Sequence, residues 1–266
     1  MLTNYHTHTT FCDGDNTAEE MVKSAIEKGF SALGFSGHGY TAFDHTYCMQ
    51  DTNGYIAEIN RLKEKYKKDI QIYLGIEENV GGEAERSDFD YLMGSSHYFR
   101  IDGAYYPIDS NPDCFKKCLD LFGGDVLNLA ESYYTPFCEY ILKRKPDIIG
   151  HFDLITKFDE MGESIFFSNE KYLKLSEKYL REAMKSGSIF EVNTGAISRG
   201  YRTAPYPHIN LLHILKKEGG KIIINSDSHA ADTLDCHFKE TKKMLKDIGF
   251  QYTYILYDNE FKKNYL

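Results

Sequence analysis

The sequence predicts an α/β fold in which parallel strands form a barrel and helices cover it. Two observations carry this prediction. Short apolar segments alternate with longer amphipathic segments along almost the whole chain, an order typical of a parallel sheet whose strands are joined by helices. There are also eight such apolar segments, and this number favours a closed barrel over an open sheet. The length of 266 residues fits one barrel, and with no repeat or linker we expect a single domain over residues 1–266.

The elements are expected in strict alternation for most of the chain. Strands are expected at 2–6, 31–35, 70–76, 91–95, 147–150, 189–193, 221–225 and 252–256. Helices are expected at 17–29, 51–67, 112–122, 125–144, 169–186, 208–218 and 230–248. Four stretches without a clear pattern follow strands, at 38–50, 78–90, 99–111 and 194–207. In a parallel barrel such stretches lie on the rim at the carboxyl ends of the strands, where active sites are built.

Capping signals mark the starts of two helices. Thr17 precedes Glu19 and Glu20, which is typical of an N-cap followed by an acidic first turn. The Lys28-Gly29 pair then ends that helix in the usual way. Ser168 precedes an amphipathic segment and is expected to start the helix at 169–186.

Polar residues gather at the downstream ends of the expected strands. The first strand leads into His6 and His8, and the strand at 221–225 leads into Asp227 and His229. Residues two apart in a strand point to the same face, so each pair can reach one ion together. Other strand ends carry His38, Glu77 and Glu78, His97, and His151. Six of the ten histidines are thus expected on one rim.

These residue types predict a metal site. Imidazole nitrogens and carboxylate oxygens are ligands for zinc, manganese or iron, and the set contains no sulfur. Because the set exceeds what one ion needs, we expect two or three divalent metal ions. Asp13 adds a carboxylate that is a candidate ligand or proton donor, although an Asp followed by Gly14 is also typical of a turn. Spacing alone does not choose between Glu77 and Glu78.

Composition argues against several partners. A formal net charge of −9 disfavours binding to a nucleic-acid polymer, which depends on neutralising phosphates. No segment is apolar enough for a membrane span or a signal peptide. The six cysteines are scattered without a CxxC pair, which predicts reduced thiols in a cytoplasmic protein. A monomer and a homodimer both remain open.

The ordered motifs resemble the polymerase and histidinol phosphatase (PHP) superfamily. The resemblance rests on the strand-end residues above, and within the superfamily the segments GSSH at 94–97, GHFDLI at 150–155 and EVNTGAISRG at 191–200 look like its stand-alone histidinol-phosphate phosphatases. It implies a distorted (β/α)7 barrel with a trinuclear metal site on the C-terminal rim of the strands. It also favours Glu77 over Glu78. The metal ligands that it implies are His6, His8, Asp13, His38, Glu77, His97, His151, Asp227 and His229.

The resemblance further implies an activity. The expected reaction is hydrolysis of a phosphate monoester, L-histidinol phosphate, by a hydroxide that the metals activate. Asp13 or His229 is the candidate proton donor to the leaving alkoxide. Three cations in the rim loops are candidate clamps for the phosphate: Arg199, Arg202 and Lys157.

Two alternatives stand beside this function. One is a PHP phosphoesterase that acts on small nucleotides such as nucleoside 3′,5′-bisphosphates. The other is a metal-binding protein without catalytic activity. The groups that recognise the rest of the substrate are not evident, and the tyrosines and acidic residues of 38–50 and 99–111 are the first place to look.

Overall fold

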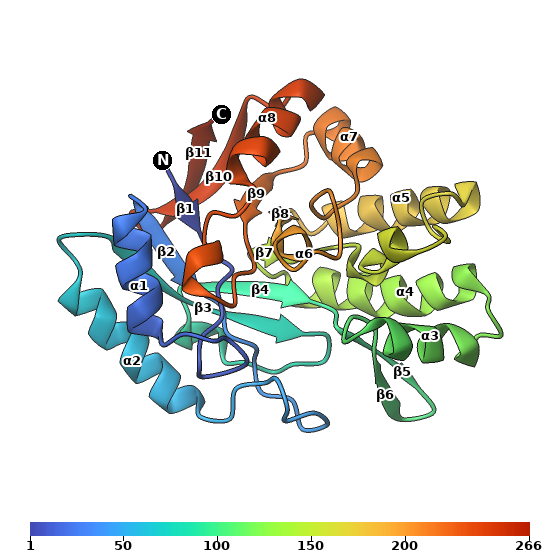
Figure 1. The fold of residues 1–266 in the computed structure, drawn as a ribbon, viewed down its shortest axis with the longest axis horizontal. Helices are drawn as coiled ribbons and strands as arrows, with labels where there is room; N and C mark the ends of the chain where they lie inside the picture. Colours follow the sequence, from blue (N-terminus) through green and yellow to red (C-terminus); the bar gives the residue numbers. More distant parts are fainter.

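Seven parallel strands form a sheet that curls into a barrel (Figure 1) in a computed structural model that describes residues 1–266. The order of the strands in the sheet is β1-β2-β3-β4-β7-β8-β9, and every neighbouring pair is parallel. The strands are β1 (Thr3–Asn4), β2 (Ala32–Phe35), β3 (Gln71–Asn79), β4 (Tyr91–Ser95), β7 (Ile148–Ile149), β8 (Ile189–Asn193) and β9 (Ile222–Asn225). The prediction of a distorted seven-stranded barrel is confirmed.

The barrel closes between β1 and β9, just beyond the ends of these two strands. The amide of His8 donates to the carbonyl of Ser228 at 2.8 Å, and the amide of Ser228 donates to the carbonyl of His6 at 3.1 Å. Thr7 and Ser228 thereby form an isolated parallel bridge. The barrel therefore closes between the segment that carries His6 and His8 and the segment that carries Asp227 and His229.

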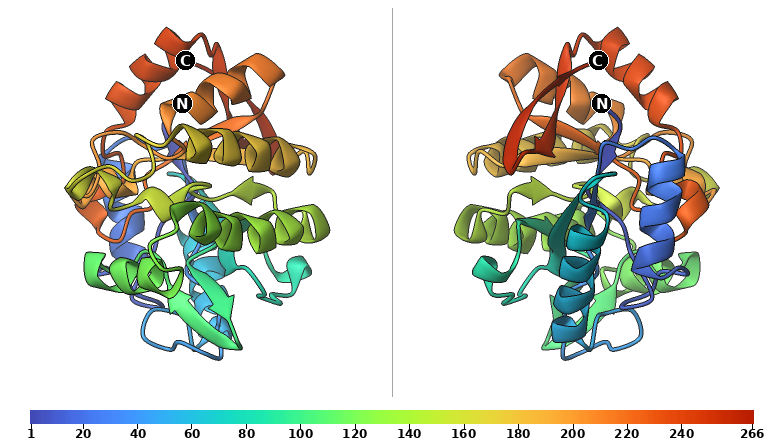
Figure 2. Two further views of the ribbon diagram at one scale, coloured as in Figure 1. Left: turned by 90° about the vertical axis from the view of Figure 1, so that its right-hand side faces the viewer. Right: turned by 90° about the vertical axis from the view of Figure 1, so that its left-hand side faces the viewer.

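Helices surround the barrel on its outer side (Figure 2). The longer ones are α1 (Ala18–Glu27), α2 (Thr52–Lys65), α3 (Pro112–Leu121), α4 (Val126–Arg144), α5 (Glu170–Met184), α7 (Ile209–Glu218) and α8 (Phe238–Ile248). Short turns of helix lie in the rim loops: α6 (Gly195–Ser198), η2 (Leu154–Thr156), η3 (Asp159–Met161) and η4 (Ala231–Thr233). A further turn, η1 (Arg86–Asp88), lies near the ends where the strands begin, because it comes just before β4 and Arg86 pairs with Asp147, just before β7. Among these helices there is none whose length and apolar content would suit a membrane crossing.

The two predicted caps have different outcomes. Thr17 caps α1, as expected, and it also forms a capping box with Glu20. The start of α5 was placed one residue early. Asn169, not Ser168, is its N-cap, because the Asn169 side chain accepts from the amides of the first turn.

Three other expectations about elements were wrong. The eighth strand, β10 (Tyr252–Tyr257), does not join the barrel but pairs with the antiparallel β11 (Glu260–Tyr265). A second hairpin, of β5 (Tyr98–Ile101) and β6 (Ala104–Pro107), lies where no strand was expected. The helix expected at 230–248 begins only at Phe238, because the residues before it bind the closing segment. Ser228 contacts Thr233, and Asn16 accepts from the amide of Ala231.

The β10–β11 hairpin fills the end of the barrel where the strands begin. Ile255 and Leu256 of β10 pack against inward-facing residues from the early parts of the strands, including Ala32, Tyr73 and Ile189. One level higher, the ring of Tyr91 lies across the interior, and its hydroxyl donates to the carbonyls of Tyr5 and Phe35 at 2.6 and 2.9 Å. With this end filled, the rim at the carboxyl ends of the strands is the accessible end.

Candidate metal centre

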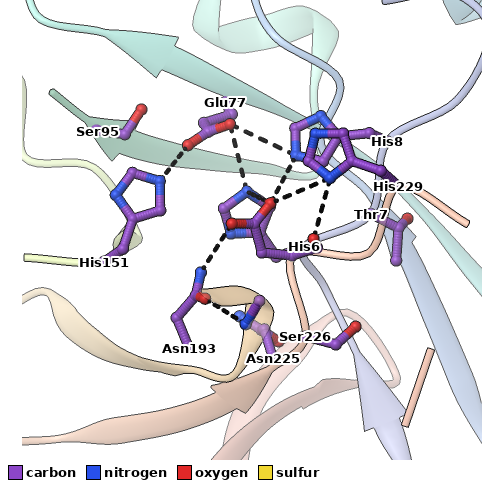
Figure 3. A network of polar contacts seen from close by, with 12 residues as sticks. His6, Thr7, His8, Glu77, Ser95, His151, Asn193, Asn225, Ser226 and His229 are labelled. Atoms are coloured by element: carbon purple, nitrogen blue, oxygen red, sulfur yellow. Dashed lines mark hydrogen bonds and ion pairs between the residues drawn. The ribbon is translucent and has the colours of Figure 1, made fainter. Parts of the chain in front are cut away.

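Glu77 faces several histidines of the rim cluster, and Figure 3 shows it between His151 and His8, with His6 below it. Its Oε2 lies 2.8 Å from Nδ1 of His38 and 3.3 Å from Nε2 of His6. Its Oε1 lies 3.1 Å from Nε2 of His97 and 2.9 Å from Nε2 of His151. One carboxylate from β3 therefore faces histidines that follow four other strands, and Glu77 belongs to two of the groups of residues that could hold an ion.

Two aspartates complete the set. Oδ1 of Asp227 lies 3.2 Å from Nε2 of His8. Oδ2 of Asp13 lies 3.4 Å from Nε2 of His229 and 3.6 Å from Nε2 of His38. The structure thus brings together all nine residues expected to bind metal, in overlapping groups whose ligand atoms lie within 4.8 Å of one another: His8, Asp13, His38 and His229; His6, Glu77 and His151; His6, His8 and Asp227; His38, Glu77 and His97.

The chemistry of these atoms fits divalent metal ions. Nε2 of His6, Nε2 of His8 and Oε2 of Glu77 are buried without a hydrogen-bond partner in the protein, which is costly unless another group satisfies them. Burial, followed by the neighbouring His229 and His38, lowers the pKa of His8 to about 3. His8 is therefore neutral and its lone pair is available, as metal binding requires.

Glu78, which the sequence did not separate from Glu77, has another role. It points away from the cluster, and its Oε1 accepts from Nε of Arg144 and from the hydroxyl of Tyr140, both at 2.8 Å. Both partners belong to α4. Glu78 therefore ties α4 to β3, next to the residue at the centre of the cluster.

Asp227 has an unusual backbone and lies close to a glycine. Its φ of 50° lies in the left-handed region, where Asp is better tolerated than most residues. A Cβ on Gly195 would lie 2.9 Å from both Cβ of Asp227 and Nη2 of Arg199. Glycine at position 195 therefore leaves room for Asp227 and Arg199 to meet.

Two carboxylates that sequence reasoning missed hold the histidines in place. Oε1 of Glu191 lies 2.6 Å from Nδ1 of His6, and its Oε2 accepts from the amide of His151 at 2.8 Å. Asp109 lies 3.6 Å from Nδ1 of His97. A contact as short as that between Glu191 and His6 fixes the tautomer and orientation of a metal-binding imidazole. The signal for Glu191 was present, because it is an acid between the apolar residues Phe190 and Val192 of strand β8.

A hollow of about 370 Å³ opens above the cluster. Arg199 lines it and donates from Nη2 to Oδ2 of Asp227 at 3.0 Å. Lys157 lines it and donates to the carbonyl of Asp109 at 2.6 Å. Arg202 does not line the hollow. It is buried over the ring of Tyr206, 4.4 Å from the ring centroid, so the structure brings only two of the three candidate clamps to this space.

The fold and the rim cluster define an α/β barrel with a divalent-metal site at the carboxyl ends of its strands. Residues 4–195 match the model of the PHP domain. The chain therefore belongs to the PHP domain family. The matched region contains seven of the nine residues of the cluster and ends before Asp227 and His229.

Relatives of known description share most of the length of the chain. A probable histidinol-phosphatase of Schizosaccharomyces pombe is 27% identical, with 92% of this chain and 86% of the relative covered. The histidinol-phosphatase of Bacillus subtilis is 24% identical, with coverage of 85% and 92%. These similarities extend well beyond the region matched by the family model.

Two solved structures have the same fold. One, from Listeria monocytogenes, has a TM-score of 0.77 at 21% identity and covers 90% of this chain and 99% of its own. The other is a histidinol phosphate phosphatase from Lactococcus lactis in complex with zinc, L-histidinol and phosphate. It has a TM-score of 0.72 at 22% identity and covers 98% and 99% of the two chains.

Proposed function

We propose that this protein is a metal-dependent phosphomonoesterase that hydrolyses L-histidinol phosphate to L-histidinol and phosphate, a reaction of histidine biosynthesis. The observation that carries the proposal is the single hollow in which metal-binding residue types and two cations, Arg199 and Lys157, face the same space. A phosphate dianion needs positive charge on several sides, which cations and bound metals supply. The names of the relatives supply the substrate.

The hydrolysis breaks the bond between phosphorus and the ester oxygen and forms a bond between phosphorus and a water oxygen. Bound divalent ions would supply a Lewis acid that polarises the phosphoryl group and makes water a stronger nucleophile. The nine residues of the cluster would hold two or three such ions, of zinc, manganese or iron. Glu191 and Asp109 would keep His6 and His97 oriented toward them.

The remaining steps fall to residues that line the hollow. Arg199 would hold phosphate oxygens with its fixed guanidinium, which Asp227 orients, and Lys157 would add a second positive charge. The departing alkoxide takes up a proton. Asp13 and His229, 3.4 Å apart at the edge of the hollow, are proposed to pass that proton on from water.

The proposal treats residues 1–266 as one functional domain, because the cluster draws on His6 near one end and His229 near the other. We also propose that the protein acts in the cytoplasm. All six cysteines are free in the structure, as expected for a reducing compartment.

The test is steady-state release of phosphate from L-histidinol phosphate, beside a nucleoside 3′,5′-bisphosphate, with the metal content measured on the same sample. We expect a preference for L-histidinol phosphate and no activity after metal removal. A metal-loaded protein that hydrolyses the bisphosphate and ignores L-histidinol phosphate would overturn the proposed substrate. A metal-loaded protein without activity on any phosphate monoester would overturn the enzyme assignment.

A further inference from the structure

One acidic residue of the hollow takes no part in the metal cluster or in an ion pair. Four carboxylates line the hollow: Asp13, Asp44, Asp109 and Asp227. Asp13 and Asp227 contact the rim histidines, and Asp109 contacts Lys157. Asp44 contacts only neutral groups. Its charge is therefore not neutralised by a contacting cation of the protein.

The carboxylate of Asp44 is held from two elements. Its Oδ1 accepts from the amide and the hydroxyl of Thr46 at 2.9 and 2.6 Å, and its Oδ2 accepts from the hydroxyl of Tyr98 on β5 at 2.6 Å. The loop is also bound to the β5–β6 hairpin, because Phe43 stacks on Tyr105 of β6 with ring centroids 3.7 Å apart. Asp44 is therefore oriented before any ligand arrives.

An aromatic wall connects Asp44 with the rim histidines. The ring of Tyr47 lies edge-on to His38, with centroids 4.8 Å apart, and 5.7 Å from the ring of Tyr98. Both tyrosines line the same hollow as Asp44. A carboxylate beside aromatic rings attracts a positively charged nitrogen, through direct contact with the carboxylate and through the negative faces of the rings.

Asp44 carries its charge at neutral pH. Burial favours the neutral acid, but the hydrogen bonds from Thr46 and Tyr98 outweigh it and lower the pKa of Asp44 below its ordinary value. The hollow therefore has one end where Arg199, Lys157 and the metal-binding residues suit an anion. Its wall near Asp44 suits a cation.

We propose that Asp44 is a specificity-determining residue that binds the cationic nitrogen of the substrate, so that the site prefers phosphate monoesters with an ammonium or imidazolium group. This inference rests on the proposed phosphatase function and deepens it. Opposite charges at two places in the hollow would fix the direction in which such a substrate lies. A neutral monoester would leave Asp44 without a partner.

The test compares Asp44→Asn with the wild-type protein on three substrates. L-Histidinol phosphate has both cationic groups, ethanolamine phosphate has only the ammonium group, and 4-nitrophenyl phosphate has neither. Asn preserves the size of the side chain and removes the charge.

We expect kcat/KM on L-histidinol phosphate to fall by about 10- to 100-fold, mainly through KM, with kcat/KM on 4-nitrophenyl phosphate unchanged. A matching fall on ethanolamine phosphate would identify the ammonium group as the one bound, and no fall would identify the imidazolium.

Glu83→Gln is the matched control, because Glu83 lines the neighbouring hollow and its loss removes the same charge nearby. It should change none of the three values. The inference is overturned if Asp44→Asn lowers activity equally on L-histidinol phosphate and 4-nitrophenyl phosphate, or leaves L-histidinol phosphate unaffected. The wild-type protein tests the proposed function separately. If it hydrolyses 4-nitrophenyl phosphate but not L-histidinol phosphate, the proposed substrate fails before any variant is compared.

Discussion

At the scale of single residues, the contacts of the metal-binding side chains depend on buried acids behind them. Glu191 illustrates this. It contacts the ring of His6 and the amide of His151, and it also accepts from Asn193 and Asn225 at 2.8 and 3.0 Å. One carboxylate therefore organises residues that follow β1 and β7.

We predict that Glu191→Gln weakens metal binding by about 10- to 100-fold, because the neutral side chain of glutamine no longer holds the ring of His6 in the required orientation. Titration of the metal-free protein with zinc or manganese measures this change. Glu260→Gln on the exposed end of β11 is the control and should bind as the wild type does. Unchanged affinity in Glu191→Gln would show that His6 does not need this contact.

A second prediction concerns Arg199. Because it faces the hollow and also holds Asp227, Arg199→Ala should raise KM for a phosphate monoester by about tenfold or more, while the metal content remains close to that of the wild type. Steady-state kinetics and metal analysis on one sample check both parts. Arg181→Ala, on the exposed surface of α5, should change neither. Wild-type kinetics in Arg199→Ala would contradict the clamp assignment.

The sequence predicted the residues of the cluster better than the residues around it. His6 and His8 have a spacing that predicts a shared face, and their position after a strand predicts the rim. The roles of Asp109 and Asp44 depend on contacts across long stretches of chain, to Lys157 and Tyr98. Spacing along the sequence carries no information about such contacts.

At the scale of elements, strands buried in the barrel were predicted well and hairpins were not. Apolar segments identify buried strands directly. The β5–β6 hairpin has a partly exposed, mixed pattern, but its turn at Asp102-Gly103 is a strong hairpin signal, and both residues have positive φ. β11 has a lysine-rich sequence, and its pairing with β10 is fixed by the turn at Asp258-Asn259.

The interior of the barrel depends on glycine in β3. A Cβ on Gly75 would lie 2.2 Å from the ring of Tyr91, which fills the middle of the barrel. We predict that Gly75→Ala lowers the free energy of unfolding by about 2 kcal/mol or more, since a tightly packed interior does not accept an added methyl group. Urea denaturation measures the effect. Gly162→Ala, where a Cβ would have no neighbour within 4 Å, should be close to neutral, and equal stability of the two variants would refute the packing argument.

At the scale of the whole molecule, closure of the barrel and assembly of the metal-binding residues depend on the same two segments. Thr7 and Ser228 form the closing backbone bridge. Cluster residues flank both of them: His6 and His8 on one side, and Asp227 and His229 on the other. The chain termini also meet, because the amino group of Met1 donates to the side chain of Asn264 at 3.0 Å (Figures 1 and 2).

Removal of metal should therefore destabilise the entire fold. We predict that a chelator lowers Tm by roughly 5 to 15 °C, because a ligand bound far above its Kd contributes several kcal/mol to a domain of this size. Differential scanning calorimetry before and after treatment measures the shift, and addition of metal should reverse it. A protein that has lost its metal but keeps its Tm would show that the cluster is not needed to close the barrel.

The position of the closing bridge also matters while the protein is being made. A ribosome releases the chain from its N-terminus, and domains fold as their residues emerge. His6, His8 and Glu77 leave early, but Asp227 and His229 come near the end of the 266 residues. Until these last two residues emerge, the nascent chain therefore carries an incomplete set of candidate ligands. The complete cluster can form only after residues 227–229 have left the ribosome.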